Sequence, residues 1–498
     1  MTITAGNFLL IGSILLFVSI VVSKAGYRFG VPTLLIFLLV GMLFGSDGLG
    51  LQFNNASSAQ FIGMLALSII LFTGGLDTRF GDIRPVLAQG IVLSTLGVVF
   101  TTLFAGLFIY WISGFGWISI TLPLTTSLLL AATMSSTDSA SVFNILRSQR
   151  MTLKYNLRPM LEFESGSNDP MAYMLTIVLI QIVSAGSMSA GDIATTLLVQ
   201  FAVGGAAGYL LGKVAVWTIN KLSLPNTALY PIVVLCFVFF VFSVADLCRG
   251  NGYLAVYVAG IVVGNSKLSF KREIVTFLDG VTWLFQIILF LMLGLLVNPH
   301  EMLSIALAGT LIGIFMILVA RPLSVMLCLL PFRKMKFTSR LFVSWVGLRG
   351  AAPILFATYP IIAEVEGANI IFNVVFFVTI LSLVVQGTTL SAMARALGLA
   401  EPQQEAPDHF GVEIPEELDT SLNAIDVTAD MLVDGAALKD VALPHGSLVM
   451  LIRRGDEYIV PNGSVQLVAG DRLLLISRDK PMPKIAAEGV PEKADGKQ

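Results

Sequence analysis

The sequence predicts an all-α polytopic membrane protein with a small soluble α/β domain at its C-terminal end. Of its 498 residues only 12% are charged, and the mean hydropathy is +0.85, whereas soluble domains have roughly 25% charged residues. Thirteen apolar stretches can be counted, each of about 20 residues and therefore long enough to cross a bilayer as a helix. After about residue 400 the composition becomes polar, which indicates a domain outside the membrane.

The thirteen predicted spans follow one another and are separated by short polar links. The first, "FLLIGSILLFVSIVVSK" at residues 8–24, has no basic region before it and no small-residue cleavage site after it. We therefore expect a retained helix and not a signal peptide. The span centres lie near residues 15, 39, 68, 100, 127, 174, 205, 237, 259, 285, 316, 350 and 382.

Lysine and arginine residues gather in every second link, after spans 1, 3, 5, 7, 9 and 11. The links between, such as residues 45–60 and 184–192, hold almost none, Arg249 being the exception. Because basic residues favour the cytoplasmic side, the N-terminus is predicted to be periplasmic and the C-terminus cytoplasmic, in a bacterial inner membrane. The basic residues are Lys24, Arg28, Arg79, Arg84, Arg147, Arg150, Lys154, Arg158, Lys221, Lys267, Lys271, Arg272, Arg333, Lys334, Lys336 and Arg340.

The chain divides by composition into a transmembrane domain at residues 1–398, a polar linker at 399–412, a cytoplasmic domain at 413–481 and a disordered tail at 482–498. In the cytoplasmic domain, residues 446–479 form short β-rich runs broken by Arg-Gly-Asp, Pro-Asn-Gly and Ala-Gly-Asp, which is typical of strands and hairpins. The upstream stretch "DGAALKDVAL" predicts a short helix, which makes this domain α/β.

Histidine and cysteine residues give no support to a metal or redox site. The three cysteines are scattered, and none of the three histidines falls within an apolar run. We therefore expect no cofactor, and we expect no nucleic-acid partner. These residues are Cys236, Cys248, Cys328, His300, His409 and His445.

Charged residues inside the apolar spans are the strongest functional signal, because they are costly in a bilayer and mark ion pathways. Span 5 ends in "SSTDS", which contains Asp138, and span 6 opens with "ESGSND", which contains Glu164 and Asp169. Span 11 carries Arg321 and span 12 carries Arg349. These positions predict an ion-handling site within the membrane.

Simpler interpretations exist for three of these residues. Asp138 would lie at a helix end at the membrane surface, although the apolar run "SVFNIL" continues past it. Asp169 would lie at the start of a helix that begins at Pro170. Arg321 would extend its charged end to the membrane interface.

Spans 5 and 12 are both interrupted by polar and glycine residues, and they lie seven spans apart. Seven is odd, so two six-helix repeats, spans 1–6 and 8–13, would have opposite orientations in the membrane. Inverted repeats with paired broken helices are how many secondary transporters build an ion site at the middle of the bilayer. We therefore expect broken helices in spans 5 and 12.

Three short motifs resemble a known family. "TDSASVF" in span 5, "ESGSNDPMA" in span 6 and "GLRGA" in span 12 are similar to the NhaP-type sodium or potassium/proton antiporters of the monovalent cation:proton antiporter-1 family. The resemblance covers residues 5–398. The C-terminal stretch from "GVEIPEEL" to "LLLISRD" resembles the TrkA-C domain, which is the C-terminal lobe of regulator-of-potassium-conductance domains. The two resemblances together indicate the potassium/proton branch.

The resemblance implies a cation and proton site in spans 5 and 6. Asp169 would be the essential carboxylate that binds either the cation or the proton. Asp138, Ser165 and the backbone of Thr137 would complete the cation shell. A carboxylate serves both ligands, because burial favours its neutral form and protonation then releases the cation.

The remaining motif residues have supporting roles in the family. Asn168 would tie span 6 to the interrupted part of span 5, Glu164 and Arg321 would form a buried ion pair, and Arg349 would hold the broken part of span 12. Ser139 departs from the family pattern, because many members have proline there.

The function implied is electroneutral exchange of cytoplasmic K⁺ for external H⁺, with Na⁺ as the alternative cation. The family works as a homodimer in lipid, and an effector of the soluble domain is expected. A cation channel with the same soluble lobe is a more remote alternative, but the sequence has no filter of the Thr-Val-Gly-Tyr-Gly type. An intramembrane protease using Asp138 and Asp169 would leave the arginines without a role, so no enzyme is expected.

Overall fold

The computed structural model describes residues 5–28, 32–51, 53, 55–116, 118, 120–402, 421–432, 436–441, 443, 447–455 and 457–477. The chain divides into two compact units, Met1–Gln403 and Gln404–Gln498. Most of the expected linker, the beginning of the expected cytoplasmic domain and the whole of the expected tail lie outside the described residues.

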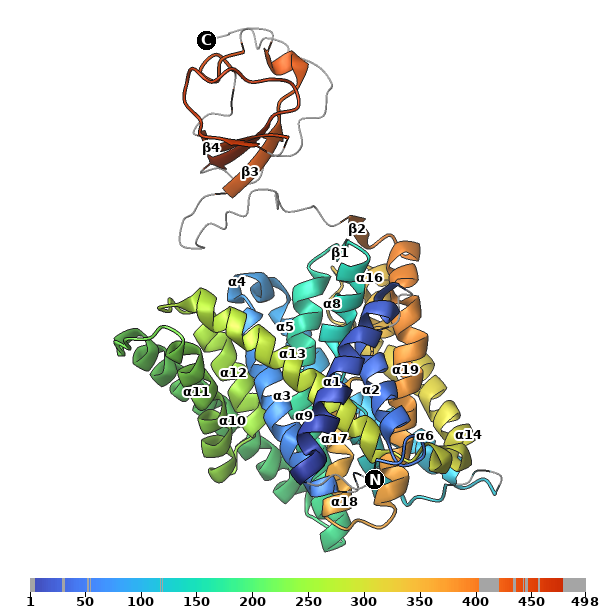
Figure 1. Ribbon diagram of the computed structural model, residues 1–498. Helices are drawn as coiled ribbons and strands as arrows, with labels where there is room; N and C mark the ends of the chain where they lie inside the picture. The colour runs from blue at the N-terminus through green and yellow to red at the C-terminus, as the bar shows by residue number, and fades with distance from the viewer. Residues whose placement is uncertain are drawn as a thin grey trace, which may run out of the picture. The chain divides into compact units, whose positions relative to one another are not determined.

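The first unit is built almost entirely of helices (Figure 1). Among the described residues, eight helical segments are long and apolar enough to cross a membrane, and five further apolar helices are shorter. The predicted helical polytopic fold is confirmed. The elements are α1 (Ala5–Arg28), α2 (Thr33–Phe44), α3 (Ala56–Asp77), α4 (Phe80–Ile83), η1 (Arg84–Val86), α5 (Leu87–Val92), η2 (Leu93–Gly97), α6 (Val98–Ser113), α7 (Leu124–Thr133), α8 (Ser139–Ser148), β1 (Met151–Leu153), α9 (Leu157–Ala185), α10 (Ala190–Lys221), α11 (Leu229–Leu247), α12 (Gly252–Gly264), α13 (Lys271–Leu296), α14 (Pro299–Phe315), η3 (Met316–Ala320), α15 (Arg321–Leu329), α16 (Phe337–Trp345), α17 (Ala351–Phe356), α18 (Thr358–Ile362), α19 (Ala368–Ala396) and β2 (Ala400–Pro402).

Two spans are interrupted where the polar motifs lie. Helix α7 ends at Thr133 and α8 begins at Ser139, so residues 134–138 are not helical. Helix α16 ends at Trp345 and α17 begins at Ala351, which leaves residues 346–350 without regular secondary structure. The two breaks touch, because the backbone N–H of Asp138 donates to the carbonyl oxygen of Leu348 at 2.8 Å. Two segments far apart in the sequence are therefore joined by a backbone hydrogen bond.

Helices α3 and α12 approach closely because glycines face each other. A Cβ atom at Gly75 would collide with the backbone oxygen of Tyr257, and one at Gly260 would collide with that of Phe72. Close approach through small residues is typical of membrane helices, which gain dispersion contacts where backbones meet. The pair forms one wall of the cavity described below.

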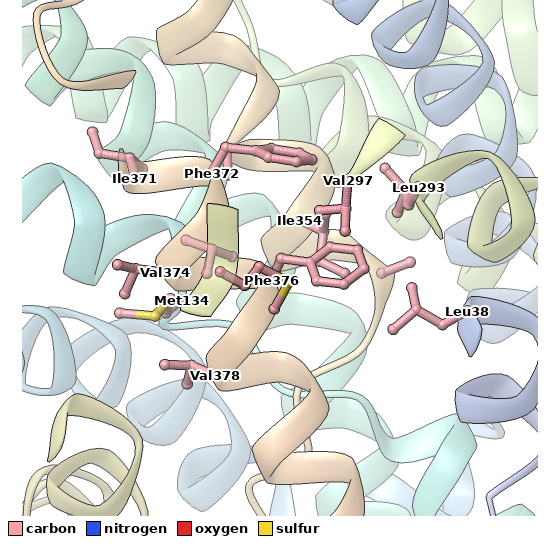
Figure 2. Packing of buried hydrophobic residues seen from close by; sticks show 14 of the residues in the cluster. Leu38, Met134, Leu293, Val297, Ile354, Ile371, Phe372, Val374, Phe376 and Val378 are labelled. Atoms are coloured by element: carbon pink, nitrogen blue, oxygen red, sulfur yellow. The ribbon is translucent and has the colours of Figure 1, made fainter. Parts of the chain in front are cut away.

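An apolar cluster surrounds the middle of α19 (Figure 2). Phe376 of α19 and Leu38 of α2 are fully buried in it, and Met134, the first residue of the break in span 5, is 1% exposed there. Apolar packing therefore anchors the break on one side. Its polar residues are free to face the opposite side.

The expected linker does not begin at residue 399. The backbone N–H of Lys154 donates to the carbonyl of Leu399 at 3.1 Å, and β2 pairs antiparallel with β1. A short stretch of the expected linker is thus attached to the membrane unit by backbone hydrogen bonds.

The second unit contains a four-stranded antiparallel sheet in the order β3-β6-β4-β5. Gly455, with φ +60°, lies in the β4–β5 turn where the Arg-Gly-Asp signal predicted one. The strands are β3 (Ser421–Asp426), β4 (Ser447–Arg454), β5 (Glu457–Ile459) and β6 (Arg472–Ser477).

The helix predicted in "DGAALKDVAL" is not present in its described part. Ala437 forms a bridge with Gln466, and the N–H of Leu438 donates to the carbonyl of Val465 at 2.9 Å. Long-range backbone bonds thus replace the helical ones. The helical content of the described residues in this unit is the 3₁₀ turn η4 (Ala429–Leu432).

Candidate functional site

A cavity of about 890 Å³ lies between α3, α8, α9, α13 and α17. Its lining includes buried residues of the break in span 5, Ser136 and Thr137, together with Asp169 of α9. It also includes Arg79 and Arg147, which are exposed. The cavity therefore leads from solvent to the polar break.

Asp169 lies in the middle of α9 and not at a helix start. The helix begins at Leu157 and continues through Pro170, so the interpretation of Pro170 as the first residue of a helix is wrong. Proline has no backbone N–H, and the carbonyl of Gly166 therefore lacks its usual helical donor. Gly166 lines the cavity. The Asp-Pro pair thus places a carboxylate and a freed carbonyl within one turn of each other.

Ser165 and Asn168 connect α9 to the break in span 5. The Ser165 hydroxyl donates to the carbonyl of Thr137 at 2.7 Å and accepts from the N–H of Ser139 at 2.9 Å. The Asn168 amide donates to the Thr137 hydroxyl at 2.6 Å. Ser165 and Thr137 line the cavity, whereas Asn168 is 0% exposed and does not. Asn168 therefore supports the break in span 5 from a position outside the cavity lining.

Asp138 begins helix α8 inside the protein. Its carboxylate accepts from the N–H of Ser141 at 3.2 Å and from the Ser141 hydroxyl at 2.6 Å, as an N-cap does. Its neighbours Ser136 and Thr137 are buried, and Asp138 itself lines the cavity. The helix end of the simpler interpretation is present, and it lies on the lining of the cavity.

Ser136 and Asn168 carry oxygen atoms that are available for further contacts. Ser136 lies close enough to Asp169 to stabilise its carboxylate, although its hydroxyl makes no hydrogen bond of good geometry. The side-chain oxygen of Asn168 is also buried without a partner among the described residues. Unpaired buried oxygens are expensive. Ser136 lines the cavity together with Asp169, whereas Asn168 does not.

Arg349 lies in the break of span 12 and also contacts the break of span 5. Its guanidinium donates to the carbonyl of Ser136 at 2.5 Å, and its backbone N–H donates to the Ser382 hydroxyl of α19 at 3.1 Å. The side chain is buried, with Arg349 3% exposed. The expectation that Arg349 holds the broken part of span 12 is thus incomplete, because its charge is directed at a carbonyl of span 5.

Glu164 and Arg321 are 2.6 Å apart, with side chains 1% and 3% exposed. Arg321 follows the π-helical turn η3 at the start of α15. The simpler interpretation, in which Arg321 reaches the membrane interface, is wrong because its charged end is enclosed by protein. The pair joins α9 to α15, a short distance along α9 from Asp169.

Asn251 is a buried polar residue that the sequence analysis missed. Its side-chain amide donates to the carbonyl of Pro170 at 2.8 Å, its side-chain oxygen caps α12 at the N–H of Leu254, and its own N–H donates to Gln200. It therefore links the turn next to Asp169 to α10 and α12. An asparagine directly before an apolar run is a sequence signal for a helix cap, but not for this contact.

A tyrosine cluster was also missed. The hydroxyls of Tyr253 and Tyr359 are 3.2 Å apart, and the ring of Tyr173 packs edge-on against both. Aromatic residues are common in membrane helices, so nothing in the sequence distinguished these three. Among the described residues, no group of three or more His, Cys, Asp or Glu side chains could hold a metal ion.

Comparisons with known proteins identify the family of this chain. Residues 12–396 match the family described as "Sodium/hydrogen exchanger, transmembrane", and residues 423–488 match the TrkA-C domain. The K(+)/H(+) antiporter NhaP2 of Shewanella oneidensis is 37% identical over 96% of this chain and 83% of its own length. The K(+)/H(+) antiporter NhaP of Alkalimonas amylolytica is 38% identical over 96% of this chain and 82% of its own length.

The structure of the sodium proton antiporter MjNhaP1 from Methanocaldococcus jannaschii at pH 8 is similar in fold. The TM-score is 0.67 at 22% sequence identity, and the match covers 78% of this chain and 99% of that one. The family match spans most of the chain and both relatives align along almost all of it. The chain therefore belongs to the transmembrane sodium/hydrogen exchanger family.

Proposed function

We propose that this protein is a secondary active antiporter that exchanges cytoplasmic K⁺ for external H⁺, with Asp169 as the carboxylate for which the two ions compete. The observation that carries the proposal is the position of Asp169 at the buried end of a solvent-open cavity, beside the crossing of two broken helices. The names of the two relatives favour potassium.

The residues around Asp169 supply the oxygen ligands that a monovalent cation needs. Unwound backbone and carboxylates coordinate cations in transporters with broken helices. Asp138, the carbonyl of Thr137 and the freed carbonyl of Gly166 all belong to residues that line the cavity with Asp169. Ser165 completes this set, although its hydrogen already bonds to Thr137. Protonation of Asp169 removes the full negative charge and releases the cation.

The buried charges support one-for-one exchange. Glu164 and Arg321 neutralise each other at 2.6 Å, so Asp169 is the carboxylate to which we assign the exchange. Asp169 then adds zero net charge whether it holds a cation or a proton. The transported charge is therefore constant, and an imposed membrane potential should leave the exchange rate in proteoliposomes unchanged. A rate that follows the potential would show that Asp138 also changes its protonation.

The membrane arrangement follows from the same features. We interpret the eight long and five shorter apolar helices of the described residues as thirteen spans, and we assign the breaks in spans 5 and 12 to two inverted repeats of six spans. The exposed cavity residues Arg79 and Arg147 come from links whose basic charge favours the cytoplasm. We infer an inward-open conformation of a homodimer in a bacterial inner membrane.

Sodium is the alternative cation, because the fold neighbour is named a sodium proton antiporter. The deciding experiment uses purified protein in proteoliposomes and offers K⁺, Na⁺, Li⁺ and Rb⁺ in turn while internal pH is followed. Potassium and rubidium should drive proton movement at the lowest concentrations. A response to sodium and lithium alone would assign the protein to Na⁺/H⁺ exchange, and no response to any cation would overturn antiport.

The TrkA-C domain is proposed to regulate exchange by binding a small effector. An effector there changes transport only if it binds two conformations with different affinity. Because β2 belongs to the membrane unit, the informative truncation follows Gln403 and not residue 399. The truncated protein should still exchange cations but with a shifted pH threshold. Superimposable pH profiles of full-length and truncated protein would leave the domain without a regulatory role.

A further inference from the structure

Two further carboxylates line the cavity and are not part of the exchange site at Asp169. Asp77 is the last residue of α3, and Asp279 lies on α13. Both line the cavity and both are exposed to it. No hydrogen bond or salt bridge to either carboxylate is found in the described part of the chain. The two carboxylates lie on α3 and α13, which are joined through the hydroxyls of Thr73 and Thr282, so two like charges line the cavity from facing helices. Arg147 is a basic lining residue that acts on both of them.

A buried amide beside this pair points to a ligand independently. Gln286 of α13 is only 7% exposed and lines the same cavity, yet its side chain makes no hydrogen bond within the described residues. The amide of Gln286 is not closed off from solvent, so its polar atoms are accessible from the cavity. They are available to hydrogen-bond an ion or its water shell there.

The polar groups form a row along two facing helices. Asp279, Thr282 and Gln286 are spaced three and four residues apart and so share one face of α13. Thr73 and Asp77 share one face of α3 for the same reason. The hydroxyls of Thr73 and Thr282 are 3.0 Å apart, which joins the two faces. The row runs from the exposed carboxylates to a nine-tenths buried amide.

The charge of the cavity favours cations. Arg158 is paired with Glu162 at 2.9 Å, which neutralises one of the three guanidiniums in the lining. Carboxylates remain in excess, and a cleft lined by one sign of charge concentrates counter-ions. The charged lining residues are Asp77, Asp82, Asp138, Glu162, Asp169, Asp279, Arg79, Arg147 and Arg158.

We propose that Asp77 and Asp279, with the hydroxyls of Thr73 and Thr282 and the amide oxygen of Gln286, form a second site for a hydrated monovalent cation on the way to Asp169. This inference rests on the proposed cation exchange. Because both carboxylates face water, the site binds weakly and releases its ion easily. Such a site lowers the half-saturating cation concentration without accelerating the step at Asp169.

The first test measures exchange in proteoliposomes as a function of K⁺ concentration. The double variant Asp77→Asn/Asp279→Asn should raise the half-saturating concentration about fivefold, the equivalent of a weak exposed charge pair. Its maximal rate should change less than the half-saturating concentration does. Asp82→Asn is the matched control, because it removes a carboxylate from the same cavity lining but lies outside the row.

Varying the ionic strength distinguishes cation binding at a defined site from long-range electrostatic attraction of cations to the cavity. High choline chloride screens long-range charge effects, so any effect of Asp82→Asn should disappear there. The effect of the double variant should persist. An unchanged half-saturating concentration in the double variant, or an effect no larger than that of Asp82→Asn at both ionic strengths, would overturn the second site.

The second test separates this inference from the proposed function. Rubidium NMR line broadening is recorded on purified Asp169→Asn protein in a choline chloride background. Broadening should remain, and it should be lost when Asp77→Asn/Asp279→Asn is added. If Asp169→Asn alone abolishes broadening, the second site is wrong even though exchange stands. If the unaltered protein exchanges no cation but broadening depends on the pair, the proposed function fails and the second site stands.

Discussion

Glu164 and Asp169 are two carboxylates five positions apart on the same helix, and their surroundings differ completely. Glu164 is 1% exposed and 2.6 Å from Arg321. Asp169 lines the cavity together with another carboxylate, Asp138. One position has its counter-charge built into the chain. The other is left to take its counter-charge from solution.

The difference shows how one helix carries both a structural and an exchangeable charge. A buried carboxylate that is paired with an arginine of the same chain keeps that partner. Separating them would leave an uncompensated charge in the protein interior, which is very costly in free energy. Between the surroundings of Glu164 and those of Asp169, Pro170 interrupts the hydrogen bonding of α9, because it leaves the carbonyl of Gly166 without its usual helical donor. Carboxylates of the same chemistry thus acquire different functions from their partners.

The largest expected effect is on transport by Asp169→Asn. Asparagine keeps the size and hydrogen bonding of aspartate but cannot release a proton or supply a full negative charge. Exchange in proteoliposomes should fall to the level of empty liposomes, while membrane insertion and thermal stability persist. Asp192→Asn, at the exposed start of α10, is the control and should exchange normally. Robust pH-dependent antiport by Asp169→Asn would remove the distinction between the two carboxylates.

The next effect is on stability, at Glu164 and Arg321. Removing one partner of a buried ion pair typically costs about 3–5 kcal/mol because the other charge is left uncompensated. Glu164→Gln or Arg321→Ala should therefore lower the thermal unfolding temperature and the yield of the protein. The double variant should recover part of the loss. Independent, additive effects in this cycle would argue against a direct interaction.

A smaller effect is expected at Asn251, whose side-chain amide donates a hydrogen bond to the carbonyl of Pro170, next to Asp169. Asn251→Ala leaves that carbonyl and the start of α12 unsatisfied, at a cost of about 1–3 kcal/mol. Thermal unfolding should show the loss, and cation affinity should fall because the turn at Asp169 is less well held. Asn220→Ala removes two exposed hydrogen bonds and should change both measurements less. Equal effects of the two variants would deny Asn251 a role at the site.

The smallest effect concerns the arginine–carboxylate pair of the soluble unit. Arg454 hydrogen-bonds Asp471 at 2.8 and 2.7 Å and lowers the pKa of that carboxyl below its ordinary value. A lowered folded-state pKa means that the stabilisation is present at neutral pH and is lost as pH falls through that pKa. Asp471→Asn should therefore speed hydrogen exchange of β4 and β6 slightly at pH 7 in the full-length protein. A difference that grows as the solution is acidified would contradict this sign.

The sequence by itself determined the helical membrane fold, because apolar stretches of bilayer length have few other stable structures. It also identified carboxylates, arginines and amides whose burial in the membrane is costly and therefore indicates a function. These signals are local: they depend on residues within one span or one turn. The turn between β4 and β5 at Gly455 was also predicted from the sequence, because a turn signal depends on neighbouring residues.

The family resemblance implied the contact of Glu164 with Arg321 and that of Asn168 with span 5, but tertiary structure decided the other contacts. The backbone of Asp138 bonds to Leu348, and Arg349 reaches a carbonyl of span 5, although these partners lie about two hundred residues apart in the chain. Asn251 and the row from Asp77 to Gln286 are likewise assembled from different helices. Hydrophobic periodicity specifies that a residue is buried, but not against what. Polar partners are chosen only when packing brings distant backbones close enough to exclude water, and the counter-charges of Glu164 and Asp169 were fixed at that stage.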